Sequence, residues 1–530
     1  MKDKLVQVGV VADCPPGEVT TITVNNVDIA LCNYEGEFYA LNNRCPHRGG
    51  QLGDGKLVGS DLICPLHEWD FDVRTGISRY DNLDRVATYA VTVEDEKLYI
   101  NLKDVPLEPR EYDSYLAQWR RPFDDREKDM NYVHYLAKGK SAKLEAMRTG
   151  LEVPGFESIL FLPGGIGKLP LLDDETVNTE TVIGPKAKRP LKLRIPVYIS
   201  HMSYGALSPE SKVALAMGAK RFGTAIGSGE GGMLPQEQEA AGAYIFEMAS
   251  GYFGFNDENV QKADAIDFKF GQAAKAGLGG ILPADKNIPE IAAVRGVEPA
   301  SEVHSPSRFP DLNDLDAIRQ RVGALRQLTE GPIGAKLAAN RIEADLEAVA
   351  YCDFDFVTID GRGGGTGAAP LHVKDNIGIP LIYAIPRARK WLDENEHSDI
   401  TLVATGGLRT PADFVKALSL GADCVAISTA AMMAIGCQQY RACHNNTCPV
   451  GIATQQSKLR ERFDIAISAE RLVNFLEASE KQILDFCRMM GHYAVAEISH
   501  EDVVTLDEAL AQNSDVRHAA ESGKSETDSR

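Results

Sequence analysis

Short apolar runs alternate with helix-like segments throughout residues 141–500 of this 530-residue chain. The runs are KLRIPVYIS, GTAIGS, AIDFKFG, PIGAKLA, FDFVTID, TLVATGG and DCVAIST, separated by segments such as LSPESKVALAMGAKRFG. Repeated strand-then-helix order predicts a parallel sheet, and the number and size of the units favour a closed α/β barrel of the (β/α)8, TIM type over an open doubly wound sheet. Because each run leads directly into Gly, Ser, Thr, Lys or Asp, functional side chains are expected at the strand ends.

The last two strand ends carry a sign of a bound phosphate. Residues 404–410 read ATGGLRT, and residues 426–430 read AISTA. Glycines such as Gly406 and Gly407 let backbone N–H groups approach a phosphate, and the loops after the last strands of such barrels often bind one. With Thr429 and Ala430 they predict bound FMN. The alternative is a glycine turn that only closes the barrel.

Three cysteines follow the last predicted strand, in the segment GCQQYRACHNNTCPVGIATQ of residues 436–455. They are Cys437, Cys443 and Cys448, at C-x5-C-x4-C spacing. Three thiolates suit a soft metal centre, and three rather than four favour an iron–sulfur cluster with a vacant corner over structural zinc. The alternative is a pair of core cysteines with an incidental third.

The first hundred residues consist of short alternating segments such as EVTTITV and KLYINL, split by Gly, Asn and Asp turns, which predict a small antiparallel β domain. Two of its loops read Cys45-Pro46-His47 and Cys64-Pro65-Leu66-His67. Two cysteines and two histidines could hold zinc. However, one Cys and one His on each of two hairpin tips resembles a Rieske [2Fe-2S] domain, here over residues 1–103. The resemblance implies that Cys45 and Cys64 bind one iron and that His47 and His67 bind the other.

The sequence departs from high-potential Rieske proteins at two places. Gly50 and Leu66 stand where those proteins carry a disulfide between the loops, and Glu68 and Trp69 replace the hydroxyl donor after the second histidine. Fewer hydrogen bonds to the cluster sulfurs should lower its reduction potential. We therefore expect a ferredoxin-type electron carrier.

Three further segments complete the predicted domain organisation. Residues 104–140 mix charge with proline and predict a partly helical linker. Residues 468–490 place apolar side chains at helical spacing and predict an amphipathic helix capped by Ser468. Residues 501–530 are expected to form a polar, disordered tail.

The predicted barrel domain, residues 141–500, resembles the FMN-binding synthase domain of glutamate synthases. The shared motifs lie at residues 201–208 (HMSYGALS), 229–232 (GEGG), 272–283 (QAAKAGLGGILP), 335–337 (AKL) and 361–370 (GRGGGTGAAP). The resemblance also assigns the three cysteines to a [3Fe-4S] cluster. It places these residues around FMN: Ser203, Tyr204, Gly205, Gln272, Lys336, Gly364, Gly365, Thr366, Gly367, Gly406, Gly407, Thr429 and Ala430.

The resemblance implies an oxidoreductase acting on a CH–NH2 group, in which reduced FMN delivers a hydride to an imine made from a 2-oxo acid and ammonia. Lys275 and Lys336 lie at predicted strand ends and could hold negative charge on the flavin or on a substrate carboxylate, while Glu230 could shuttle a proton. The alternative for either lysine is a buried ion pair in the barrel mouth.

Several family positions that help bind 2-oxoglutarate are changed. Residues 225–228 (AIGS) lack the family's lysine, and residues 233–235 (MLP) replace acidic and arginine residues. Arg362-Gly363 replaces His-Asp, and Phe309-Pro310 replaces His-His. Arg308 and Arg362 are the candidates to supply the missing cation. The glutaminase cysteine of the family has no counterpart, so glutamine hydrolysis is not expected. Two other functions stay open: an FMN-dependent dehydrogenase of another amine or oxo acid, and a redox relay without substrate turnover.

Composition excludes several partners and environments. A net charge of −20 with scattered basic residues argues against nucleic acid. No long apolar run and no secretory signal are present, and ten unevenly spaced cysteines suggest no disulfide framework, so we expect a cytoplasmic protein without a membrane span. No G-x-G-x-x-G fingerprint follows a strand, so an external ferredoxin or a separate NAD(P)H-dependent reductase would supply electrons. A homo-oligomer stays open. The cysteines expected to be inert are Cys14, Cys32, Cys352, Cys424 and Cys487.

Overall fold

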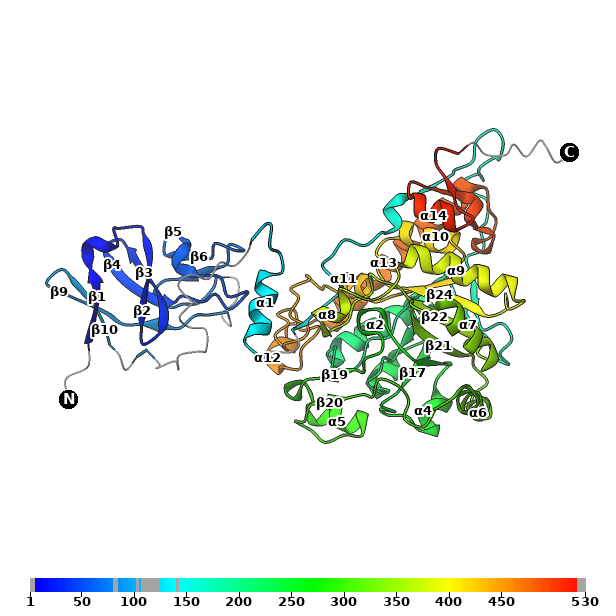
Figure 1. Cartoon of the computed structure of the whole chain (residues 1–530), viewed down its shortest axis with the longest axis horizontal. Coiled ribbons are helices and arrows are strands. Elements are labelled where there is room, and N and C mark those ends of the chain that lie inside the picture. The colour runs from blue at the N-terminus through cyan, green and yellow to red at the C-terminus, as the bar shows by residue number, and fades with distance from the viewer. Residues whose placement is uncertain (1–4, 80–83, 102–103, 106–123, 140–142, 522–530) are drawn as a thin grey trace. The chain divides into compact units, whose positions relative to one another are not determined.

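The computed structural model describes residues 5–79, 84–101, 104–105, 124–139 and 143–521. The chain divides into two compact units, residues 1–140 and 141–530, and Figure 1 labels many of their elements. Residues 106–123 and 140 of the predicted linker lie outside the described residues. The described part of that linker contains one helix, α1 (Met130–Ala137).

The first unit is built from antiparallel strands, as predicted. A four-stranded sheet has the order β2-β3-β4-β8, and a three-stranded sheet has the order β1-β10-β9. Asn25 and Asn26 join β2 to β3 with φ angles of 51° and 63°, a two-residue turn that matches the right-handed twist of hairpins. The bounds are Leu5–Val10 (β1), Val19–Val24 (β2), Val27–Tyr34 (β3), Glu37–Asn42 (β4), Thr88–Tyr89 (β8), Val91–Glu94 (β9) and Lys97–Asn101 (β10).

A smaller antiparallel sheet of β5 (Lys56–Val58), β6 (Asp61–Ile63) and β7 (Asp70–Asp72) carries one of the two cysteine–histidine loops. The first loop follows β4, and the second joins β6 to β7. Both loops therefore rise from paired strands, which hold their positions. The buried side chains around them are Leu41, Leu52, Leu62, Phe71 and Val73, together with Cys45 and Cys64.

The second unit contains a closed barrel of eight parallel strands, which confirms the predicted fold. Neighbouring strands in the barrel are consecutive in this series: β15 (Val197–Ile199), β16 (Ala225–Gly227), β17 (Ala243–Ala249), β18 (Ala265–Lys269), β21 (Ile333–Ala338), β22 (Phe356–Asp360), β24 (Thr401–Thr405) and β25 (Cys424–Ile427).

Helices and short strand pairs surround and close the barrel (Figure 1). The helices up to the cysteine segment are α2 (Pro209–Phe222), α3 (Pro235–Ala240), α4 (Asp257–Lys262), α5 (Pro289–Arg295), α6 (Leu315–Leu325), α7 (Ile342–Tyr351), α8 (Leu371–Lys374), α9 (Leu381–Glu394), α10 (Pro411–Ser419) and α11 (Thr429–Ala434). A further short helix, α12 (Ser457–Arg460), follows the cysteine segment. The strand pairs are β11 (Leu144–Glu145) with β23 (Ala369–Pro370), β13 (Thr181–Ile183) with β14 (Leu191–Leu193), and β19 (Ile281–Leu282) with β20 (Val303–His304).

Two strands differ from the predicted set. Strand β17 was not among the seven predicted runs, because its sequence AYIFEMA lacks period-two alternation and follows a stretch rich in Glu and Ala. The predicted run over residues 192–200 is two elements: its start belongs to the hairpin of β13 and β14, and only Val197–Ile199 enters the barrel. Pro196 stands between the two parts and lacks the N–H that a continuous strand would use.

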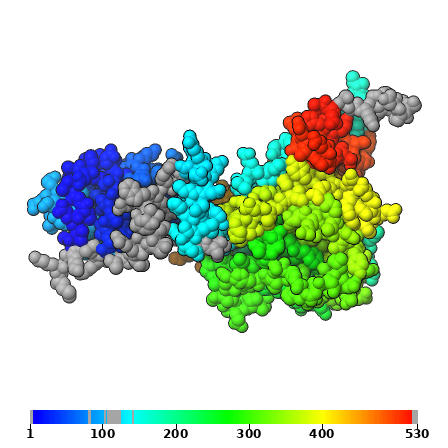
Figure 2. All heavy atoms as spheres, in the orientation of Figure 1, coloured from blue at the N-terminus to red at the C-terminus, as the bar shows by residue number. Residues whose placement is uncertain are grey.

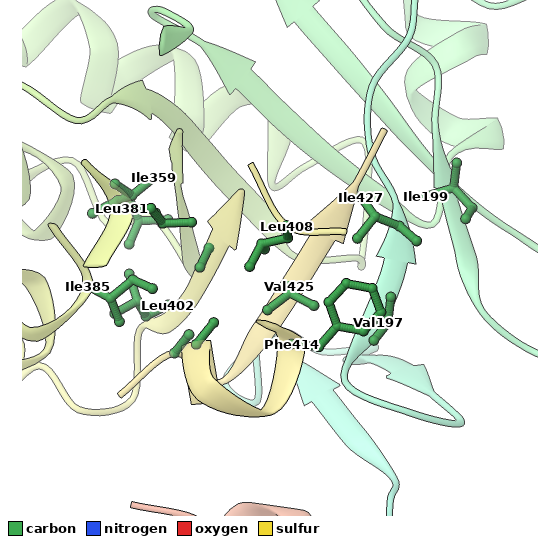
Figure 3. Packing of buried hydrophobic residues seen from close by; sticks show 14 of the residues in the cluster. Val197, Ile199, Ile359, Leu381, Ile385, Leu402, Leu408, Phe414, Val425 and Ile427 are labelled. Atoms are coloured by element: carbon green, nitrogen blue, oxygen red, sulfur yellow. The ribbon is translucent and has the colours of Figure 1, made fainter. Parts of the chain in front are cut away.

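The barrel core has two layers because successive side chains of a strand point to opposite faces. Tyr198, Ile245, Phe356 and Val403 form one buried cluster with the β13–β14 hairpin. The neighbouring positions face outward: in Figure 3, Leu402 lies near Leu381 and Ile385 of α9, while Val425 lies near Phe414 of α10. The strand ends are thereby fixed on a rigid, fully packed frame.

The C-terminal region is more ordered than predicted. Helix α13 (Ile465–Met490) begins three residues before Ser468, because Asp464 caps it by accepting a hydrogen bond from the Ile467 N–H. Residues 501–521, expected to be disordered, contain β26 (Val503–Thr505), α14 (Glu508–Asn513) and β27 (Arg517–His518).

Pairing with a distant strand explains this order. β26 pairs antiparallel with β12 (Ile159–Phe161). The buried side chains of Val503 and Leu510 further stabilise this region. Figure 2 shows the red C-terminal surface packed against the yellow part of the barrel unit. Residues 522–530 of the predicted tail lie outside the described residues. Among the described residues, no helix is long and apolar enough to cross a membrane.

Candidate functional site

A large cavity opens at the C-terminal ends of the barrel strands and holds about 1350 Å³ of empty space, counting its mouth. Every strand contributes a lining residue at or near its end: Ser200, Gly229, Glu247, Lys269, Lys336, Asp360, Thr405 and Ser428. The predicted site residues that line it are Ser203, Glu230, Gln272, Lys275, Lys336, Gly364, Gly365, Thr366, Gly367, Gly406, Gly407 and Thr429. The sequence motifs therefore converge on one cavity.

Three predicted cofactor residues lie outside the lining. The Tyr204 carbonyl accepts a hydrogen bond from Arg295 Nη2 at 2.7 Å, and the Gly205 carbonyl accepts one from Gln455 Nε2 at 3.2 Å. Ala430 belongs to α11, and its side chain is buried in the core. These residues support the cavity wall from behind.

One side of the cavity is built from glycine-rich backbone. Gly406 has a φ of 109°, and a Cβ there would lie 2.4 Å from the Gly361 carbonyl oxygen, so only glycine fits. Its neighbour Gly407 and the loop of Gly364 to Gly367 also line the cavity. Backbone N–H groups of these glycine loops can bind a phosphate, and the lysine and arginine side chains elsewhere in the lining suit an electron-rich ring. The residues present therefore fit FMN.

A chain of buried ion pairs crosses the cavity wall. Lys269 Nζ lies 2.6 Å from Glu230 Oε2 and 3.6 Å from Glu247 Oε1, while Lys336 Nζ lies 3.2 Å from Glu247 Oε2. Ser305 Oγ also donates to Glu230. Burial alone would raise the pKa values of both carboxyl groups, but the neighbouring lysines lower them. The charges of Lys269 and Lys275 lower the pKa of Glu230 to about 2. The charges of Lys336 and Lys269 lower the pKa of Glu247 to about 2. Both carboxylates stay ionised at neutral pH.

Four cations of the lining are in no ion pair among the described residues: Lys275, Lys286, Arg295 and Arg409. Burial, followed by the charge of Lys269, lowers the pKa of Lys275 to about 8, although Glu230 opposes the shift. Burial lowers the pKa of Arg295 to about 10. Arg295 stacks over Phe253, with its guanidinium carbon 5.2 Å from the ring centre, and its Nε makes no hydrogen bond. Lys286 Nζ and Arg409 Nη1 donate to the carbonyls of Cys443 and Leu408, whereas Lys275 and Arg295 both interact with the charge of Glu230. Lys275 and Arg295 are therefore the candidate cations for an anion bound on that side of the cavity.

Sequence reasoning missed Glu247, Lys269 and Arg295 as site residues. Glu247 lies on the unpredicted strand β17, and Arg295 lies at the end of helix α5, where no strand-end pattern marks it. Lys269 ends a predicted strand, so its position was a usable signal. His201, the first residue of the HMSYGALS motif, also lines the cavity, with Nε2 3.0 Å from Asp267 Oδ2.

Neither arginine named as a substitute cation reaches the cavity. Arg362 Nη2 donates to the Asp375 carbonyl at 2.6 Å, and Arg308 Nη1 donates to Asn313 Oδ1 at 2.8 Å. Both guanidinium groups bond within their own loops and lie outside the lining. Arg295 lines the cavity instead.

The three cysteines Cys437, Cys443 and Cys448 line a second, smaller cavity of about 340 Å³. Burial and then the neighbouring sulfurs raise the pKa of the Cys443 thiol to about 11, so bound iron would be needed to hold thiolates there. Cys443 also lines the large cavity, as do Met147, Met432 and Ala453. The donor set fits a cluster held by three cysteines directly beside the flavin cavity.

The cysteine segment is anchored by buried polar contacts. Lys286 Nζ donates to the carbonyls of Cys443 and Ala453 at 2.7 and 3.1 Å. Asn446 Nδ2 donates to the Asp285 carbonyl at 3.1 Å, and Gln455 Nε2 donates to the Leu207 carbonyl at 2.9 Å. These contacts tie the segment to two loops of the large cavity.

In the first unit, the two cysteine–histidine loops have matching backbones. The Cys45 N–H donates to the Gly50 carbonyl at 2.9 Å, and the Cys64 N–H donates to the Trp69 carbonyl at 2.7 Å. Both cysteines are buried, whereas His47 is half-buried and His67 is exposed. The imidazole centroids are 4.7 Å apart. An inner sulfur pair and an outer imidazole pair fit the two irons of a Rieske cluster.

The positions that depart from high-potential proteins face this site. A Cβ at Gly50 would lie 2.7 Å from Cys64 Sγ and 3.1 Å from Leu66 Cδ1, so the two loops meet here without a disulfide. The Trp69 ring stacks on His47 with centroids 4.4 Å apart. Among the described residues, no group of three or more His, Cys, Asp or Glu side chains surrounds a single ion position. A Rieske iron takes two protein ligands, and each iron of a three-cysteine cluster takes one.

Residues 166–493 match the conserved region in glutamate synthase, which is more than half of the chain. The chain belongs to the glutamate synthase family. Residues 4–90 match the Rieske [2Fe-2S] domain, as predicted for the first unit. Both matches agree with the two resemblances drawn from the motifs.

Relatives from two organisms are similar to much of this chain. The archaeal glutamate synthase (NADPH) of Methanocaldococcus jannaschii is 38% identical over 339 residues, covering 62% of this chain and 66% of that protein. The glutamate synthase large subunit-like protein of Rhizobium meliloti is 34% identical over 379 residues, covering 68% and 86%. The chain spans just under two thirds of the archaeal-type synthases it matches. A solved structure of mandelate oxidase with a difluorinated hydroxy acid is 16% identical, with a TM-score of 0.41, covering 64% of this chain and 85% of that chain.

Proposed function

We propose that the chain is an iron–sulfur flavoprotein oxidoreductase that aminates a 2-oxo acid reductively. Electrons from an external ferredoxin or a separate NAD(P)H-dependent reductase enter at the Rieske cluster, pass to a [3Fe-4S] cluster at the three-cysteine cavity, and reach FMN in the barrel. The substrate is 2-oxoglutarate or a close analogue, and ammonia is the amine donor. The proposal includes no glutaminase step and places the reaction in the cytoplasm.

The observation that carries this proposal is the shared wall of the two cavities. Cys443 lines both, so an electron carrier bound by its sulfur would lie next to the flavin cavity. A pure relay would not need the second feature, a wall in which Lys275 and Arg295 are buried near Glu230 and are in no ion pair among the described residues. Lys275 and Arg295 offer two charges, which matches the two carboxylates of 2-oxoglutarate.

FMN, held against the glycine loops, would supply the hydride. Arg295 and Lys275 would bind and orient the substrate carboxylates in a wall from which water is largely excluded. Proton transfer is better assigned to Lys275 than to Glu230. Because its pKa is about 8, Lys275 can lose a proton near neutral pH, whereas Glu230, near 2, stays a carboxylate and orients Lys269.

The family positions that differ lie outside the cavity lining, so the cations of the lining remain. Met233, Leu234 and Phe309 are buried in the apolar core and lie outside the cavity lining. The strand over residues 225–227 is likewise buried behind His201. This favours an oxo acid with a carboxylate over an uncharged substrate.

Flavin oxidation tests the proposal. The purified protein, reduced anaerobically with dithionite, should show recovery of the oxidised flavin absorption band when 2-oxoglutarate and ammonium are added together. Either compound alone is the control. No recovery above those controls would exclude 2-oxoglutarate amination, and recovery with a different oxo acid would reassign the substrate.

Cys64→Ser tests the electron entry point. The substitution removes one of the two buried cluster sulfurs, so the Rieske EPR signal should vanish while FMN stays bound. Flavin reduction by an external ferredoxin should then fall to the rate seen without ferredoxin. Cys14→Ser, at a buried cysteine of the same unit that belongs to a different core cluster from Cys45 and Cys64, is the matched control and should keep the signal. Unchanged flavin reduction in Cys64→Ser would show that electrons enter elsewhere.

A further inference from the structure

Lys286 is a buried cation that neither the fold nor the substrate explains. It belongs to the short turn Ala284–Lys286 and is 2% exposed. Among the described residues, no carboxylate forms an ion pair with it, and the adjacent Asp285 side chain is exposed to solvent. Burying an ammonium group without a counter-charge is costly, so its retention here calls for an anion nearby.

Its hydrogen bonds show where that anion would lie. Lys286 Nζ donates to the carbonyl of Cys443 and to the carbonyl of Ala453, which stand on either side of Cys448 in the sequence. Cys443 and Ala453 both line the cavity of the three cysteines as well as the large cavity, and Lys286 itself lines the large one. The ammonium group therefore sits at the wall between the two cavities, on the backbone of the cysteine segment.

Three thiolates bring negative charge to the smaller cavity when they hold a cluster, and a buried positive charge beside them is screened little by water. Each added electron makes the cluster more negative. A fixed cation nearby therefore stabilises the reduced cluster more than the oxidised one, which raises the reduction potential.

We propose that Lys286 is a positioning residue and the resident counter-charge of the three-cysteine cluster. Its ammonium group fixes the cysteine segment at Cys443 and Ala453, and its charge raises the potential of the cluster so that the cluster accepts electrons before they pass to the flavin cavity. This inference rests on the proposed function, because it requires an iron–sulfur cluster at these three cysteines.

Three substitutions separate the charge from the hydrogen bonds. Lys286→Met removes both in a side chain of similar length, Lys286→Gln keeps a donor without charge, and Lys286→Arg keeps the charge. The measurement is an EPR-monitored redox titration of the three-iron signal in the full chain after anaerobic cluster reconstitution. We expect a lower midpoint potential in the Met and Gln variants and a value near the original in the Arg variant.

Lys212 provides a matched control. It is equally buried and also donates to two backbone carbonyls, those of Met202 and Ser228, but it is paired with Glu237 at 2.8 Å. Replacing the pair together, Lys212→Met with Glu237→Gln, removes no net charge and should leave the cluster potential unchanged. A potential that shifts equally in this control would overturn the assignment, because the effect would then reflect packing.

Two failures are distinguishable. If the unsubstituted protein gives a three-iron signal and the Met and Gln variants keep its potential, Lys286 is not the counter-charge and the proposed function stands. If the Lys286→Met variant loses the cluster, the midpoint potential of the Lys286→Gln variant is compared with that of the unsubstituted protein, since Gln retains a donor to the carbonyls. If the unsubstituted protein gives no three-iron signal at all, the cluster assignment and this inference are both wrong.

Discussion

Cys443→Ser is expected to stop electron delivery to the flavin cavity while leaving the Rieske EPR signal and the barrel fold intact. Cys443 is the one ligand candidate among the described cysteines that lines both cavities, and its Sγ lies 3.9 Å from Met147 Sδ in their common wall. A serine hydroxyl is a poor ligand for iron in such a cluster, since the sites prefer soft thiolates. The three-iron EPR signal should vanish, and turnover with an external reductant should fall to background.

The control is Cys352→Ser. Cys352 is buried at the end of α7, where its Sγ hydrogen-bonds the Leu315 carbonyl at 3.5 Å, a contact that a serine hydroxyl can also make. This variant should keep the three-iron signal and its turnover. Full turnover in Cys443→Ser, with flavin still reduced by the external donor, would show that electrons bypass the three-cysteine cavity.

Replacement of Lys275 is expected to have the second large effect. In the unsubstituted protein the ammonium form of Lys275 predominates below about pH 8, because burial and Lys269 lower its pKa from that of a free lysine. If this form binds the oxo acid and donates a proton, activity should fall as the pH rises through about 8. Lys275→Met should lower kcat/KM by about 10²- to 10⁴-fold, the usual worth of a positioned proton donor, and should remove this pH dependence.

Lys275→Arg separates charge from proton donation. A guanidinium stays protonated far above pH 8, so substrate binding should partly recover while the fall near pH 8 disappears. Lys416→Met is the control: this lysine also lies partly buried, on α10, but bonds the Phe156 carbonyl outside the cavity. A Lys275→Met variant that keeps both the rate and the pH profile would remove Lys275 from the reaction.

The metal motifs were predictable because their spacing is local. Cys45, His47, Cys64 and His67 lie on two short loops, and three cysteines lie within one 20-residue segment, so the sequence alone brings each set close together. Strand ends were predictable for a related reason, since the carboxyl ends of parallel barrel strands meet on one face. Lys275, Lys336 and Gly406 were placed on the cavity by that rule.

The remaining features depend on contacts between distant segments. Glu247 could not be found without β17, whose sequence suits a helix as well as a buried strand. Arg295 reaches the cavity from a helix, so no strand-end rule applies to it. β26 is ordered by β12, more than 300 residues earlier, which composition alone cannot reveal. For Lys336 the sequence left two roles open, a cation that meets the ligand or one member of a buried ion pair. In the structure Lys336 is paired with Glu247.

The most direct test of reductive amination at the barrel mouth is a single-turnover measurement. The dithionite-reduced protein, freed of excess reductant, is mixed anaerobically with 2-oxoglutarate and ¹⁵N-labelled ammonium, and the labelled glutamate formed is compared with the flavin oxidised. The reduced flavin holds two electrons and the two reduced clusters hold one each, and each amination consumes two, so two labelled glutamates for each flavin oxidised are the expected result, with none formed by Lys275→Met on the same time scale. Flavin that stays reduced, or that is oxidised without labelled glutamate, would contradict the proposed reaction.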